Sequence, residues 1–283
     1  MAIITFTSDG KRETGQTLSC VAFATQMAIE HNYRILLVST AFQENILEAC
    51  YWDLNRTETT AKKIVTDSAQ QQAGIESGIE GLLKIIASNR TSTDIVRNYT
   101  KVVFKERLDV LFAPKTDNFN DYLQMTTQYV DVLQTANRCY DMVIVDLNKQ
   151  VEPNAKRAIL DNSDVVIYNL IQNLGVINHF KDMREADEFY RKRNIMVALG
   201  KYDRFSKYNI KNVSKYLRER KEVNVIPYCT LFFESAEEGT VVDYFLSIRK
   251  LSDEEDRNVV FVKDVEKMCN DVVYKLQELQ MRM

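Results

Sequence analysis

The strongest constraint on the fold comes from residues 3–17, which have the sequence IITFTSDGKRETGQT. A β-branched run leads to Gly10, four residues separate it from Gly15, and a hydroxyl side chain follows at Thr17 before an apolar helical pattern. This order of strand, G-x-x-x-x-G, hydroxyl and helix is typical of a phosphate-binding loop. Gln16 stands where such a loop carries its lysine. The segment predicts the shape of the loop and leaves its activity open.

A second motif lies at residues 140–146, where the sequence YDMVIVD ends an apolar run on Asp146. This is the form of a Walker B strand, whose terminal carboxylate lies near a bound metal and its waters. A carboxylate at the end of a strand also fits a capping role in the next turn. The two motifs occur in the right order and together predict a P-loop fold.

Short β-branched runs alternate with helical patterns along the chain. The predicted fold class is α/β, a mostly parallel, twisted sheet of about seven strands with helices on both faces. Ligands of such sheets bind at the carboxyl ends of the strands. Strands are expected near residues 2–7, 34–39, 108–113, 141–146, 164–169, 194–200 and 223–227, and helices near 18–29, 118–138, 174–192, 208–220 and 262–282. Residues 52–107 show no recognisable chemistry.

Composition indicates one domain over residues 1–283. The chain is 45% hydrophobic and 27% charged, enough apolar residues for a large core, and its 8 glycines and 3 prolines form no flexible linker. Five cysteines without CxxC spacing predict buried, reduced thiols and a cytoplasmic setting. With 2 histidines, a histidine metal site or a Ser-His-Asp triad is disfavoured. No signal peptide or membrane-spanning run is expected.

The loop resembles that of the ParA/MinD family of deviant Walker ATPases, which reads KGGxGKTT and begins with a signature lysine. Lys11 falls at the signature position, and Gly15 and Thr17 match. The departures from the pattern are Arg12, Glu13, Gln16 and Leu18. The resemblance implies a nucleotide-binding P-loop domain in which Lys11 crosses a dimer interface to the partner's phosphates. An exposed lysine on a turn is also often only solvated.

The resemblance extends over nearly the whole chain. Residues 34–43 look like the family's VLLIDxDPQ, with both aspartates missing at Ser39 and Ala41. Residues 195–203 resemble its vvlNrYD strand, with Gly200 in place of the asparagine that contacts adenine. Residues 225–242 look like its IPyd close. These RYD-like and IPY-like endings are similar to the TadZ/CpaE branch, which is associated with positioning Tad pilus secretion machinery.

The resemblance implies two sets of site residues. The nucleotide-binding set is Gly10, Lys11, Thr14, Gly15, Gln16, Thr17, Leu18 and Pro227, and the Mg²⁺ set is Thr17 and Asp146. ATP or ADP with Mg²⁺ is the implied cofactor. Gln16 lacks the charge of the loop lysine, and a charge-assisted hydrogen bond contributes roughly 1.5–3 kcal/mol against about 1 for a neutral one. Three interpretations stay open: a turn that binds nothing, a loop that binds without turnover, and a hydrolysing site.

Two functions follow from these interpretations. The first is a degenerate, dimeric positioning or scaffolding factor for a Tad/type IV pilus or secretion assembly, cytoplasmic and brought to a cell pole or membrane periphery through its partners. The second is an active partitioning ATPase that cycles on DNA. The missing groups at Gln16, Ser39, Ala41 and Gly200 favour the first.

The distribution of charge along the chain indicates one further candidate binding surface. Residues 181–221 contain 13 basic and 6 acidic side chains, from Lys181 to Lys221, in a chain of net charge −3. This region fits DNA phosphates, an acidic partner, or simply the solvated faces of surface helices. The C-terminal helical pattern has an apolar stripe and a polar face of mixed charge, which favours packing on the domain or a partner subunit over a lipid surface.

Overall fold

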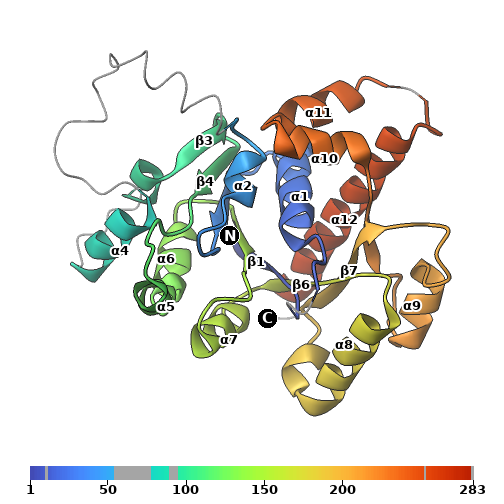
Figure 1. The fold of residues 1–283 in the computed structure, drawn as a ribbon, viewed down its shortest axis with the longest axis horizontal. Coiled ribbons are helices and arrows are strands. Elements are labelled where there is room, and N and C mark those ends of the chain that lie inside the picture. The colour runs from blue at the N-terminus through green and yellow to red at the C-terminus, as the bar shows by residue number, and fades with distance from the viewer. Residues whose placement is uncertain (10–11, 54–77, 89–94, 252, 282–283) are drawn as a thin grey trace.

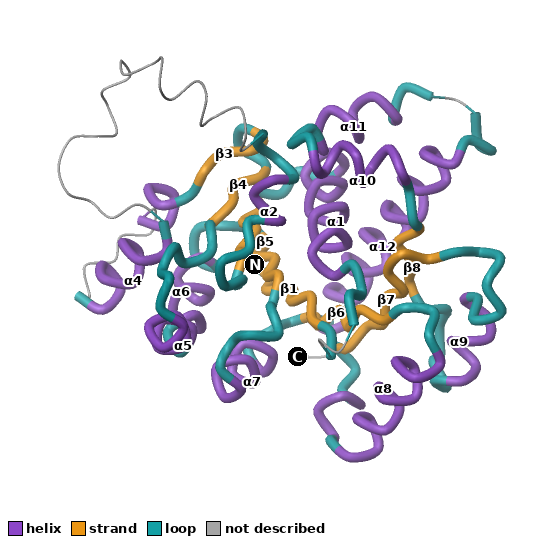
Figure 2. The backbone as a smooth tube through the Cα atoms, viewed as in Figure 1, coloured by secondary structure: helices purple, strands orange, loops and turns teal. Residues whose placement is uncertain are grey.

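The computed structural model describes residues 1–9, 12–53, 78–88, 95–251 and 253–281. Its centre is an eight-stranded sheet of order β3-β4-β2-β5-β1-β6-β7-β8, in which every pairing except β3–β4 is parallel. Figure 2 shows the strands crossing the middle of the molecule. The strands are β1 (Ala2–Thr7), β2 (Ile35–Ser39), β3 (Lys101–Phe104), β4 (Leu108–Leu111), β5 (Met142–Asp146), β6 (Val165–Leu170), β7 (Ile195–Tyr202) and β8 (Asn224–Pro227).

Helices cover both faces of this sheet (Figure 1). One face is covered by α1 (Gln16–Glu30), α2 (Ile46–Ala49), α10 (Thr230–Glu237), α11 (Val241–Ile248) and α12 (Arg257–Gln280). The other is covered by α4 (Ile79–Ala87), α5 (Phe119–Thr126), α6 (Tyr129–Ala136), α7 (Pro153–Asp161), α8 (Leu174–Ala186) and α9 (Ile210–Tyr216), with 3₁₀ turns at Ile95–Tyr99 and Glu188–Arg191. The central strands are buried on both sides, which explains their unbroken apolar sequences.

The predicted α/β fold class is confirmed, and all seven expected strands are present. The sequence did not predict β3, an antiparallel edge strand with an irregular register between Val102 and Phe104. Its first two residues are exposed, and its apolar run is short, because Val102 to Phe104 lie between Lys101 and Lys105. Lys101 lies on this edge strand, with its ammonium 4.1 Å from the centre of the Trp52 ring. A charged residue on an edge strand discourages pairing with another chain.

The helix expected over residues 118–138 is two helices, α5 and α6, that meet at Thr127 and Gln128. The Thr126 hydroxyl donates to the Leu123 carbonyl and the Thr127 hydroxyl to the Gln124 carbonyl. Such side-chain bonds compete with the helical ladder, and they end α5. The stretch expected over 174–192 likewise ends at Ala186, before a separate 3₁₀ turn.

The C-terminal helix packs on the domain, as its mixed polar face predicted. Val265, Met268, Cys269 and Val272 of α12 are buried in the core that includes α1. All five cysteines are buried and none forms a disulfide. Within the described ranges, no helix has the length and apolarity needed to cross a bilayer.

Candidate functional site

The candidate site lies at the carboxyl ends of the central strands. The register places Asp146, the last residue of β5, beside Phe6 of β1 and beside Ser39 of β2. Thr40 follows Ser39 and joins the two strand ends, because its hydroxyl donates to the Asp146 carbonyl at 2.8 Å and accepts from the Asn148 amide at 2.8 Å. These strand ends therefore meet at one edge of the sheet, as the topology rule predicted.

The turn that leads into α1 has the backbone expected of an anion-binding loop. Gly15 has a φ of 72° and is the residue before the first turn of α1, where no side chain caps the helix. The amides of this first turn are therefore available to an acceptor outside the helix. Gly10 and Lys11 lie outside the described residues, so the predictions for the first loop glycine and for the signature lysine stay predictions.

Gln16 and Thr17 both bond to Asp146. The Gln16 side-chain amide donates to one oxygen of the Asp146 carboxyl group at 2.6 Å and to the Leu147 carbonyl at 3.0 Å. The Thr17 hydroxyl donates to the other oxygen at 2.7 Å. The two predicted Mg²⁺ ligands, Thr17 and Asp146, are thus hydrogen-bonded to each other. The side-chain amide of Gln16, at the position of the loop lysine, bonds to the same carboxylate.

Asp146 is a buried carboxyl group at the end of β5. Its side chain is buried, and this desolvation raises the pKa of the carboxyl group above its ordinary value. The bonds from Thr17 and Gln16 lower the pKa in part, and the negative charge of Glu44 raises it. Since Gln16 is neutral, the loop position that normally supplies a compensating charge does not do so here.

Gly200, which was interpreted as the substitute for an adenine-contacting asparagine, has a packing role in this structure. A Cβ atom at this position would lie 2.2 Å from the Thr14 carbonyl oxygen, and 3.3 Å from both the Asn169 amide nitrogen and the Ser19 hydroxyl. Only glycine lets the end of β7 approach the loop backbone this closely. A glycine at the end of an apolar strand, in a chain with few glycines, was the available signal.

Two lysines beside the loop were missed by the sequence motifs. The side chain of Lys201 lies over Gly15, and its ammonium is 3.7 Å from the Glu13 carboxylate. The Lys156 ammonium, from α7, donates to the Ser8 carbonyl at 3.4 Å. Burial lowers the pKa of Lys156, and the Asp9 carboxylate partly offsets this effect. These cations come from distant parts of the chain, and neither was predicted as a site residue.

Several buried polar side chains around the loop lack a hydrogen-bond partner among the described residues. They are the hydroxyls of Thr7, Thr14 and Ser39 and both amide atoms of Asn169. Such groups are rare in proteins and usually mark an internal water or a ligand. They cluster at the carboxyl ends of β1, β2 and β6 and in the loop, at the edge where a nucleotide is expected.

Two further predicted site residues, Leu18 and Pro227, make their contacts in other parts of the molecule. Leu18 is half-buried and packs on the core beneath α1. Pro227 ends β8 in register with Tyr202, and the next amide, of Tyr228, donates to the Tyr202 carbonyl at 3.1 Å. In the part of the chain that the structure describes, no group of three or more His, Cys, Asp or Glu side chains is arranged to hold a metal.

This fold is the fold of the ParA/MinD P-loop ATPases. The ParA family ATPase of Chlorobium tepidum TLS matches with a TM-score of 0.68 and 16% identity over 95% of this chain and 98% of its own. A chain of the MinC:MinD cell division protein complex of Aquifex aeolicus matches with a TM-score of 0.63 and 16% identity over 96% of each chain. Pyrococcus horikoshii MinD, solved with Mg-ADP, matches with 0.61 and 14% over 97% and 98%. No protein-family model and no curated protein matches the sequence.

Proposed function

We propose that this chain is a ParA/MinD-like positioning factor, a single domain that acts as a homodimer and binds nucleotide weakly with little or no hydrolysis. The observation that carries the proposal is the pair of bonds from the Gln16 amide to Asp146 and Leu147. At this loop position a lysine normally reaches the β- and γ-phosphates. Here a neutral amide is engaged with the protein itself, and acids are absent at Ser39 and Ala41.

The residues around the loop fit a Mg-nucleotide on most counts. Thr17 and Asp146 are oxygen donors of the kind that Mg²⁺ binds directly or through water, and the first turn of α1 presents uncapped amides. The unpartnered Thr14 hydroxyl and Asn169 side chain leave polar groups for a ligand or its waters to satisfy. Thr17 and Asp146 would hold the metal, and the turn at Gly15 the phosphates. A bound Mg²⁺ supplies charge neutralisation at the phosphates.

The partner class follows from the sequence resemblance to the TadZ/CpaE branch, which is carried by the segments at 195–203 and 225–228. We assign the chain to a Tad/type IV pilus or secretion assembly on that ground. The solved MinC:MinD complex shows that a protein of this fold forms a complex with a partner protein. Co-purification of the tagged protein from its host tests the assignment: recovery of pilus or secretion components supports it, and recovery of none of them overturns it.

An ATP titration with and without Mg²⁺ tests the nucleotide function. Thermal shift reports binding, because a ligand that binds only the folded state raises its stability, and phosphate release reports turnover. The expected result is a small, Mg²⁺-dependent shift with little phosphate release. Release at the rate of an intact ParA or MinD ATPase would refute the proposal in favour of the partitioning ATPase, and the absence of any shift would reduce the loop to a scaffold.

The substitution Gln16→Lys is expected to raise ATP affinity about tenfold. Restoring the charge replaces a neutral interaction of about 1 kcal/mol by a charge-assisted one of roughly 1.5–3 kcal/mol, and each 1.4 kcal/mol is a factor of ten in affinity. Isothermal titration with ATP and Mg²⁺ measures the change. Gln124→Lys, on the exposed surface of α5, adds the same charge away from the loop and is expected to leave affinity unchanged. Equal gains in both variants would assign the effect to net charge alone.

A further inference from the structure

A cavity lies at the amino ends of β7 and β8, on the side of the sheet opposite the carboxyl ends where the loop lies. It has a volume of about 500 Å³ and lies between the starts of β7 and β8, the turn after α9 and the second half of α12. Because the residues of β7 rise about 3.3 Å each, roughly 10–16 Å of strand separates the groove-lining Ile195 to Val197 from Gly200. The groove is therefore a site distinct from the nucleotide edge.

Much of the basic region predicted from the sequence lines this groove. Four cations of the groove lining pair with acidic side chains of the protein within 4.0 Å, namely Arg184, Arg191, Lys192 and Lys275. The other four, Arg193, Arg218, Arg220 and Lys221, have no such ion pair with an acid in the described part of the chain. The groove thus presents a net positive charge to whatever enters it.

The walls of the groove are fixed by contacts within the protein. The Arg184 guanidinium donates to the Leu217 carbonyl at 3.2 Å and pairs with Glu219 at 2.5 Å, which ties the turn after α9 to α8. On the facing wall the Lys221 ammonium lies 4.2 Å from the centre of the Tyr274 ring. These cations are held in place by surrounding structure, so binding a ligand costs less ordering of side chains.

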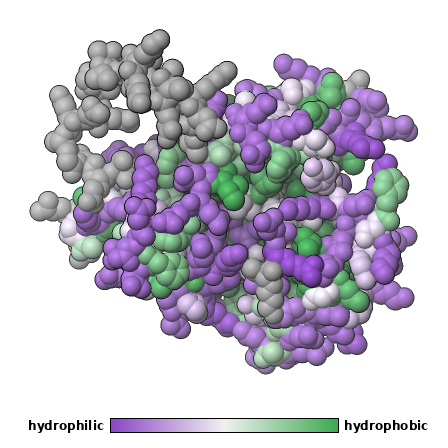
Figure 3. Space-filling view, viewed as in Figure 1, coloured by the Kyte–Doolittle hydropathy of each residue, from purple (hydrophilic) through white to green (hydrophobic). Residues whose placement is uncertain are grey.

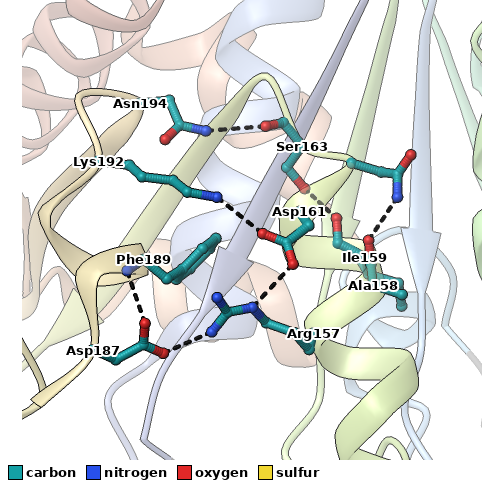
Figure 4. A network of polar contacts seen from close by, with 10 residues as sticks. Arg157, Ala158, Ile159, Asp161, Ser163, Asp187, Phe189, Lys192 and Asn194 are labelled. Carbon is teal, nitrogen blue, oxygen red and sulfur yellow. Dashed lines mark hydrogen bonds and ion pairs between the residues drawn. The ribbon is translucent and has the colours of Figure 1, made fainter.

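A polar network holds the segment that precedes β7 (Figure 4). Asp161 accepts hydrogen bonds from Lys192 and Arg157, each at 3.0 Å, and Arg157 also bonds to Asp187 at 2.6 Å. The Asn194 amide donates to the Ser163 carbonyl at 3.1 Å. Arg193 lies between Lys192 and Asn194, the two anchored residues, so its position at the groove is set by the network.

We infer that this groove binds an acidic peptide segment of a partner protein, one that carries apolar side chains among its carboxylates. The unpaired cations attract the carboxylates, and the lining includes apolar side chains, among which Met196 is partly exposed beside the buried Ile195 and Val197. Its volume is in the range that ligands and short segments fill. The face of the molecule seen in Figure 3 is largely hydrophilic, with hydrophobic residues among the polar ones.

The same lining disfavours nucleic acid. Four carboxylates, Glu219, Glu222, Asp271 and Glu278, stand among the cations and would repel a backbone whose every unit is negative. Tyr274, over whose ring Lys221 lies, is the one aromatic side chain among the described residues of the lining, so the groove has no series of aromatic side chains on which successive bases could stack. A peptide can place apolar residues opposite these carboxylates, whereas a phosphodiester chain cannot.

Fluorescence anisotropy with a labelled peptide in which Glu and Leu alternate tests this inference. Wild-type protein is expected to bind the peptide, with affinity that falls as salt is raised, and to bind the same peptide with Gln in place of Glu at least about tenfold more weakly. The double variant Arg193→Glu with Arg220→Glu is expected to lose at least about tenfold in affinity for the acidic peptide. Lys211→Glu with Lys215→Glu, on the exposed face of α9, makes the same change in net charge outside the groove and is expected to retain affinity.

Three results would overturn the inference: no binding of the acidic peptide by wild type, equal loss in the groove and control variants, or a labelled DNA duplex that binds more tightly than the peptide and is weakened by the groove variant alone. Circular dichroism verifies folding, and Arg193→Gln with Arg220→Gln replaces the reversal if it fails to fold. ATP titrations are expected to be the same for wild type and the groove variant, so this result stands or falls separately from the nucleotide function.

Discussion

Gly200→Ala is expected to destabilise the protein by about 1–3 kcal/mol and to abolish the nucleotide-dependent thermal shift. The added methyl group would lie 2.2 Å from the Thr14 carbonyl oxygen, a backbone atom that cannot move without shifting the loop. The Asn169 amide and the Ser19 hydroxyl, each at 3.3 Å, close the other directions. The loop must therefore separate from the end of β7, and the turn at Gly15 loses its support.

Urea denaturation and a repeat of the ATP titration measure the two effects. Gly175→Ala is the matched control, because the added Cβ atom meets only the Asn173 side-chain oxygen at 3.2 Å, within the first turn of α8. It is expected to change the free energy of unfolding by less than about 1 kcal/mol, since alanine is favoured over glycine inside a helix. A Gly200→Ala protein as stable as wild type would contradict this prediction, because the loop backbone would then move to accommodate the methyl group without a cost in stability.

The sequence predicted the sheet well because its parallel strands are buried on both faces and leave unbroken apolar runs. The segments at 2–7, 141–146 and 164–169 became β1, β5 and β6 with shifts of at most one residue at either end. The failures occurred where burial gives no such run. Edge strand β3 is half exposed, and the break between α5 and α6 depends on two threonine hydroxyls whose direction no periodicity indicates.

The candidate site was predictable where its residues are neighbours in sequence or belong to a motif. Gly15, Thr17 and Asp146 belong to two such motifs, and the structure brings Thr17 and Asp146 into contact. The contacts of Lys156 and Lys201 join segments more than a hundred residues apart, so they depend on the tertiary fold. The roles of the site residues stay predictions until nucleotide binding is measured.

Burial of the Asp146 carboxylate affects the stability of the fold. Burial raises the pKa of Asp146, because the charged form loses its hydration and no ion pair with a cation of the described residues replaces it. We therefore expect Asp146 to lower the stability of the fold at neutral pH, and a metal held by Asp146 would supply the positive charge that offsets this cost. Such destabilising groups are commonly retained at functional sites.

Asp146→Asn is expected to raise the free energy of unfolding at pH 7 and to remove the Mg²⁺-dependent part of the nucleotide-induced thermal shift. The pKa of Asp146 in the folded state lies above its unfolded value near 3.8, so the folded protein binds more protons between these two pKa values. The free energy of unfolding of the wild type therefore rises as pH falls through the folded pKa. The advantage of the variant is therefore largest above the folded pKa and shrinks toward pH 4. Urea denaturation across this range measures the difference.

Asp161→Asn provides a control of opposite sign. Burial raises the pKa of Asp161, but hydrogen bonds and charge from Lys192 and Arg157 together outweigh this effect and lower the pKa below its ordinary value. This carboxylate therefore stabilises the fold above its unfolded pKa, and that contribution is lost as pH falls through the folded value. The control variant is expected to be less stable than wild type at pH 7, and by a small amount, since the pairs are exposed. An Asp146→Asn protein that is also less stable at pH 7 would show that the Gln16 and Thr17 donors outweigh the cost of burial, and that Asp146 is a structural cap of the turn.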